Sequence, residues 1–108
     1  MKPLLLSISI LIPTFAQADS YILGAGRWTC EEVITAHDAQ DQGKIFQAAG
    51  WLLGYWSAET NYRDNAFVDI VENAGGLAIY NQSVAECRKA PAGTKLYELA
   101  NSMINNTR

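Results

Sequence analysis

The chain has 108 residues, eight basic and eleven acidic side chains, and a formal net charge of −3 at pH 7. This length allows one domain with a small core. The acidic balance, without a basic run, argues against binding to nucleic acid or to an anionic membrane surface.

The first eighteen residues have the pattern of an export signal. Lys2 gives a positive start, residues 4–15 are an apolar stretch, and Ala16-Gln17-Ala18 fits a small-x-small cleavage site. We therefore expect residues 1–18 to be a cleaved signal peptide and residues 19–108 to be a single helical domain in the periplasm. The longest apolar run after cleavage, Ala48 to Trp56, has nine residues and is too short to cross a bilayer.

Two cysteines, Cys30 and Cys87, lie 57 positions apart. Export removes them from a thiol-reducing compartment, so a disulfide is the favoured interpretation. A redox site is the alternative, but catalytic dithiols usually lie close together, as in Cys-x-x-Cys. Closing a loop of this size would stabilise the fold by about 4 kcal/mol.

The first predicted helix runs from Cys30 to His37. Thr29 and Glu32 fit a capping box at its start, in which each residue's side chain accepts from the other's backbone N–H. The preceding segment, Asp19 to Arg27, contains two glycines and shows no clear periodicity. We expect it to be extended or loose.

The second predicted helix runs from about Lys44 to Thr60. It is apolar nearly all round, which is typical of a helix at the centre of a bundle. Gly50 and Gly54 each cost about 1 kcal/mol relative to alanine, so we expect another helix to approach them closely. The apolar stripe of this helix contains Ile45, Phe46, Ala49, Leu52, Leu53 and Trp56.

Residues 61–76 are harder to interpret. Phe67 to Val71 could form a strand, a helical turn or an apolar loop, and Gly75-Gly76 is a break. The third predicted helix runs from Leu77 to Arg88, and the fourth begins near Thr94 after Pro91 and Gly93. The expected core face of the third helix is Leu77, Tyr80, Val84 and Cys87, and that of the fourth is Leu96, Leu99, Ala100, Met103 and Ile104.

No catalytic or metal-binding constellation is visible. The single histidine, His37, lies beside Asp38 in a polar stretch, and no nucleophile motif accompanies it. We expect an exposed histidine at a helix carboxyl end, where its charge suits the helix dipole, in preference to a general base. The prediction is a protein that is not an enzyme, with no catalytic residues, no metal and no cofactor.

Three motifs occur in order between residues 26 and 104: Trp28-x-Cys30, then Trp51-Leu52-Leu53-Gly54-Tyr55, then Cys87-Arg88-x-x-Pro91 followed by an amphipathic helix. The pattern resembles small exported helical proteins related to the acid-stress chaperones HdeA and HdeB, and is similar to cysteine-containing immunity proteins of type VI secretion. The resemblance implies an all-α fold, a compact bundle of about four helices with one disulfide, Cys30–Cys87, joining the first and third helices. It also implies a periplasmic protein that binds other proteins.

The chain departs from this family in two places. Ala85-Glu86 stands where relatives often have an aromatic residue or asparagine before the second cysteine, and residues 61–76 have no clear counterpart.

The leading hypothesis is a chaperone of unfolded client proteins. At low pH the carboxylates lose their charge, the fold loosens through charge repulsion, and an apolar surface containing Trp51, Leu53 and Tyr55 binds clients. These three residues could instead belong to the core. The alternatives are an immunity or inhibitor protein that binds one cognate effector, and an envelope component with another partner. A homodimer is a further expected form.

Overall fold

The structure, a computed structural model, describes residues 21–62 and 68–107, with side chains omitted at 68–71. Its elements are a 3-10 turn, η1 (Gly24–Arg27), and the helices α2 (Cys30–Asp38), α3 (Gln42–Tyr62), α4 (Val68–Lys89) and α5 (Leu96–Asn105). Within the described residues no strand is present, and the predicted all-α fold of four helices is confirmed. The expected signal peptide lies outside the described residues.

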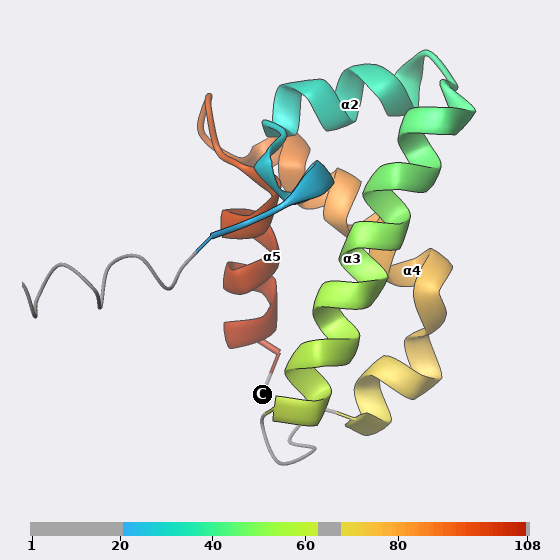
Figure 1. Ribbon diagram of the computed structural model, residues 1–108, viewed down its shortest axis with the longest axis vertical. Coiled ribbons are helices and arrows are strands. Elements are labelled where there is room, and N and C mark those ends of the chain that lie inside the picture. Colours follow the sequence, from blue (N-terminus) through green and yellow to red (C-terminus); the bar gives the residue numbers. More distant parts are fainter. Residues whose placement is uncertain (1–20, 63–67, 108) are drawn as a thin grey trace, which may run out of the picture.

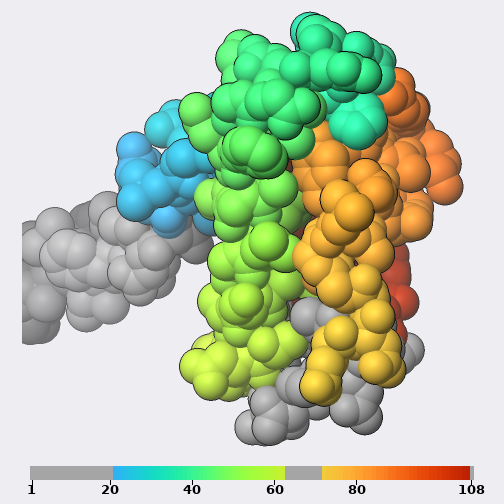
Figure 2. All heavy atoms as spheres, turned by 90° about the vertical axis from the view of Figure 1, so that its right-hand side faces the viewer, coloured from blue at the N-terminus to red at the C-terminus, as the bar shows by residue number. Residues whose placement is uncertain are grey.

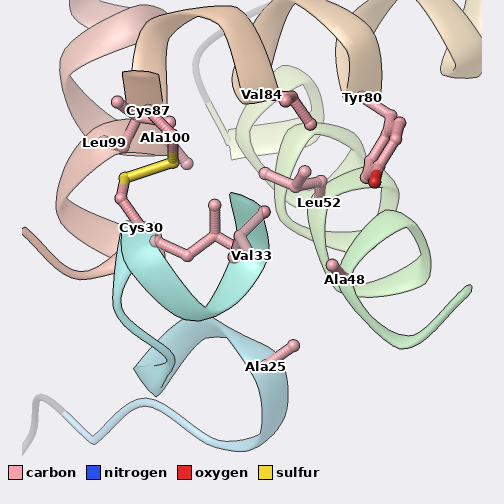
Figure 3. Close-up of a cluster of buried hydrophobic side chains, with 11 residues drawn as sticks. Ala25, Cys30, Val33, Ala48, Leu52, Tyr80, Val84, Cys87, Leu99 and Ala100 are labelled. Atoms are coloured by element: carbon pink, nitrogen blue, oxygen red, sulfur yellow. A yellow bond between two sulfur atoms is a disulfide. The ribbon is translucent and has the colours of Figure 1, made fainter. Parts of the chain in front are cut away.

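Helix α2 lies across one end of a bundle made by α3, α4 and α5 (Figure 1). The Cys30–Cys87 disulfide joins α2 to α4, which are the first and third predicted helices, so that prediction is confirmed. Around the bridge, buried side chains from all four helices form one core, including Val33, Leu52 and Val84 (Figure 3). The disulfide is therefore part of the core and not a surface link.

The helix α2 begins at the predicted capping box. The backbone N–H of Glu32 donates to Thr29 Oγ1 over 3.2 Å, and that of Thr29 donates to Glu32 Oε1 over 2.8 Å. These bonds satisfy two N–H groups that have no partner within the helix.

The amino ends of α2 and α5 meet. Thr29 and Lys95 pair as an isolated antiparallel bridge. The first N–H of each helix donates to a carbonyl just before the other: Cys30 to Thr94 over 2.7 Å, and Leu96 to Trp28 over 2.8 Å. Each helix thus satisfies a backbone donor of the other, which fixes their relative position.

The segment before α2 is more ordered than its sequence indicates. Instead of remaining extended, the chain forms η1 over Gly24–Arg27 and buries Ala25 and Gly26 against α3. The prediction of a loose segment is wrong for these residues, because contact with Trp51 of α3 compensates for the flexibility of the two glycines.

The helix α3 is central but is not covered all round. The elements η1, α2, α4 and α5 all pack against it, as expected of a helix at the centre of a bundle. Ala48, Leu52 and Trp56 are buried, whereas Phe46 and Leu53, expected in the core, are 68% and 39% exposed. A Cβ added at Gly50 or Gly54 would meet no heavy atom within 4 Å, so the expected close approach of another helix there is wrong.

The helix α4 is longer than predicted and bends at Gly75, whose φ of 79° is non-helical. Helical backbone therefore also precedes the glycine pair, from Val68. Tyr80, Val84 and Cys87 are buried as predicted. Leu77, however, is 75% exposed, because Gly76 faces α3 and the next residue turns about 100° away from that contact.

The helix α5 agrees with its predicted pattern. The four most buried residues of its stripe are Leu96, Leu99, Ala100 and Ile104, and Met103 is partly buried. The carboxylate of Glu98 accepts from the backbone N–H of Lys95 over 2.9 Å, which closes the start of the helix.

Candidate functional site

Two regions of the molecule carry features that a small compact core does not require. The first is the α2–α4 corner, defined here by His37, Asp38, Tyr80 and Arg88. The second is the open face of α3, defined by Phe46, Gly50, Leu53 and Gly54.

An ion pair holds the carboxyl end of α2 to α4 at the corner. Both terminal nitrogens of Arg88 donate to the carboxylate of Asp38, over 2.6 and 3.3 Å. Both side chains remain about half exposed, so the pair alone adds little stability at neutral pH. Its geometry nevertheless fixes where α2 ends on α4.

His37 makes the second contact of the corner. Its Nδ1 lies 3.0 Å from the hydroxyl of Tyr80, and the two rings lie 5.6 Å apart at an angle of 49°. The imidazole is half-buried, so the expectation of a solvent-exposed histidine is wrong. The reason is that α2 lies flat on α4, which brings the buried Tyr80 under its last turn.

Two carboxyl groups of α2, those of Glu31 and Asp38, have a lowered pKa. The hydrogen bond from Arg88, together with its charge, lowers the pKa of Asp38. Hydrogen bonds from its own backbone N–H and from that of Gly93 lower the pKa of Glu31, whose Oε2 lies 3.2 Å from the Gly93 nitrogen. A carboxyl with a lowered pKa in the fold stabilises it above the usual carboxyl range, and this contribution is lost as pH falls below about 4.

Trp51 and Tyr55, two of the predicted binding residues, stack on each other along α3, with ring centroids 4.9 Å apart and planes within 14°. Both are partly buried and pack against the main core, and Tyr55 also packs against a second buried cluster around Trp56. Trp51 in addition contacts η1, where Gly26 lies against its indole. Whether the two residues also bind another protein stays a prediction.

We expect Gly26→Ala to loosen this contact. A Cβ at position 26 would lie 2.2 Å from Trp51 Cζ2, so the indole must shift. Overpacking of this kind costs about 1–3 kcal/mol of unfolding free energy. Urea unfolding followed by tryptophan fluorescence measures the loss, with Gly50→Ala as the control because its added Cβ meets open space. Equal midpoints for wild type and Gly26→Ala would contradict the packing described here.

The open face runs along α3 at three- and four-residue spacing. Phe46 and Leu53 are its large side chains, with Gly50 and Gly54 between and beside them. No residue from 45 to 58 is charged. Leu53 also reaches α4, since a Cβ at Gly76 would lie 2.7 Å from its Cδ2, and the exposed Leu77 follows directly.

Figure 2 shows α3 and α4 side by side at the surface on the side turned away from α5. Isolated exposed apolar residues are common in soluble proteins, but an uncharged helix face with two large exposed apolar side chains is typical of a contact surface. Leu53 is thus the one predicted binding residue that this surface includes.

A separate apolar groove lies between α3, α4 and α5, with Trp56, Ile79 and Met103 in its lining. Its volume is about 270 Å³. Sites for small organic ligands usually measure about 300–1,000 Å³ and enclose the ligand, so the groove is at the small end for such a role.

Within residues 21–62 and 68–107, no group of three or more histidine, cysteine, aspartate or glutamate side chains is arranged to hold a metal ion. None of the helices described is both long enough and apolar enough to cross a membrane. Comparison with protein-family models, curated proteins and solved structures finds no significant match to this chain.

Several residues of these regions escaped the sequence reasoning. Arg88 was expected only as a helix residue, and Tyr80, Phe46 and Leu77 were expected in the core. The acidic residue at the end of the first helix and the basic residue after the second cysteine are the only signals for the corner. The two glycines in an otherwise apolar helix are the signal for the open face.

Proposed function

We propose that this chain is a small exported protein-binding domain of the acid-stress chaperone kind, which holds partly unfolded proteins on an apolar surface when the pH falls. The open face of α3 carries the proposal. It offers Phe46 and Leu53 to a partner and presents no charge that must be desolvated.

The acid dependence has a separate basis. The carboxyl groups of Glu31 and Asp38 both have a lowered pKa, and both connect α2 to the region around the carboxyl end of α4. Protonation removes their contribution to stability, while the seven lysine and arginine side chains of residues 19–108 keep their charge and repel one another. A disulfide resists acid and would keep such a loosened chain compact, and its presence agrees with an oxidising compartment such as the periplasm.

Phe46→Ser tests this proposal. In a light-scattering assay with an aggregation-prone client at pH 3, the wild-type mature protein should suppress aggregation, and the variant should require a higher concentration for the same effect. The matched control is Gln47→Ser, since Gln47 is the exposed neighbour and is already polar. Phe46 is exposed, so its replacement should leave the fold intact.

Wild type that suppresses no aggregation at pH 3 would overturn the chaperone proposal. That result would favour the alternative in which the chain binds one cognate protein partner. Protection that is equal in wild type, Phe46→Ser and Gln47→Ser would retain the chaperone and reject the open face as its client surface.

A further inference from the structure

The two ends of α2 are attached to the rest of the fold by different chemistry. At the amino end, the Cys30–Cys87 disulfide and the hydrogen bond from Cys30 N–H to the Thr94 carbonyl need no ionised side chain. At the carboxyl end, the side-chain attachments are the Asp38–Arg88 ion pair and the His37–Tyr80 contact. The ion pair depends on an ionised carboxylate, which takes up a proton in acid.

We infer that α2 is an acid-operated hinge, which stays attached at its disulfide end and detaches from α4 at its His37–Asp38 end when the pH falls. The inference rests on the proposed function, because it names the place where that function gains additional apolar surface. It also specifies which end of α2 moves.

The ion pair at the corner loses its attraction as pH falls. Near neutrality Arg88 is positive and Asp38 is negative, and their bidentate contact holds the carboxyl end of α2 to α4. Protonation of Asp38 removes its negative charge, and the positive charge of Arg88 then has no counter-charge in this contact.

No other described charge compensates this change. The helix α3, which also packs on α2, has no charged residue between Lys44 and Glu59. In the turn between α2 and α3, Asp41 Oδ1 lies 3.3 Å from the Lys44 backbone nitrogen, which occupies it as a helix cap. From α4, Arg88 and Tyr80 are the titratable or charged groups that contact the carboxyl end of α2.

The surface covered by α2 is apolar. Val33 and Ala36 of α2, and Tyr80 and Val84 of α4, are all buried. Figure 3 shows Val33 between the disulfide and the side chains of Val84, Tyr80 and Leu52. Lifting the carboxyl end of α2 would expose this layer while the bridge keeps the helix close.

Hydrogen–deuterium exchange on the full oxidised protein between pH 7 and pH 3 tests the hinge, after correction of each rate for its intrinsic pH dependence. Amides of residues 35–41 should open at a higher pH than those of residues 30–34. A plot of the logarithm of the opening constant of residues 35–41 against pH has a slope that counts the protons taken up.

Asp38→Asn should lower this slope, and should raise exchange of residues 35–41 already at pH 7. The control is Lys89→Gln, which removes the exposed Lys89–Glu86 pair on the neighbouring turn and should leave the slope unchanged. Equal opening of both ends of α2, or an unchanged slope in Asp38→Asn, would overturn the hinge.

The outcome is separable from that of the client assay. A corner that opens in acid without client protection retains the hinge and rejects the chaperone function. Client protection without opening of residues 35–41 retains the function and rejects the hinge.

Discussion

Cys87→Ser is expected to lower the free energy of unfolding by about 4 kcal/mol, because the bridge closes a loop of 57 residues and so restricts the unfolded chain. Domains of this size have about 5–15 kcal/mol in total, so the variant should be partly unfolded at 37 °C. Both cysteines are buried, and the new hydroxyl adds a polar group to the core.

Urea unfolding of the oxidised wild type, the Cys87→Ser variant and the reduced wild type measures this loss. The reduced wild type separates the two causes, since it lacks the bridge without the serine hydroxyl. If the midpoint of the oxidised wild type equalled that of the reduced protein, the bridge would have no stabilising role.

Leu52→Ala should cost about 2–5 kcal/mol, and the adjacent Leu53→Ala less than about 1 kcal/mol. Leu52 is fully buried among side chains of the main core, and its truncation leaves a cavity. Leu53 lies on the open face, partly over Gly76, and solvent can fill the space that it leaves. The pair is a matched comparison, with the same residue type one position apart on one helix.

Thermal and urea unfolding of both variants decide between the described packing and the arrangement expected from the apolar stripe. Equal losses for Leu52→Ala and Leu53→Ala would mean that the open face is covered in solution. In that event a second copy of the chain is the first occupant to test, by sedimentation of the wild type at pH 7.

Local sequence signals were sufficient to predict α2 and α5. The Thr29–Glu32 box placed the start of α2, and the spacing from Leu96 to Ile104 placed the core stripe of α5. The two cysteines in an export context were sufficient for the bridge. For these helices, the informative residues lie within or next to the helix that they specify. For the bridge, the two cysteines have no other cysteine with which to pair.

The open face could not be predicted, because apolar periodicity shows where a helix can pack and not how many neighbours it has. Every side of α3 is apolar enough for burial, and four neighbouring elements cover only part of it. The lower helix propensity of Gly50 and Gly54 led to the expectation of a close helix contact. That free-energy cost is the same whether the glycines lie in a close contact or on an open surface, so it does not distinguish the two.

The contacts of the α2–α4 corner could not be predicted from the sequence either. His37 contacts a residue 43 positions away, and Asp38 one 50 positions away. An unremarkable histidine and aspartate at a helix end acquire these partners only because α2 lies on α4. Of the three binding residues named from the sequence, Leu53 lies on the open face, whereas Trp51 contacts η1 and Tyr55 packs against the core.

The reciprocal hydrogen bonds between the starts of α2 and α5 have a consequence for how the chain acquires its fold. The partners of Trp28 and Cys30 are Leu96 and Thr94, more than sixty positions later. During synthesis from the amino end, the core around Val33 cannot close until Leu96 and Leu99 have been made, and contacts of such separation form slowly. Folding of this chain is therefore a late, whole-chain event, because most of the sequence must be present before the core can close.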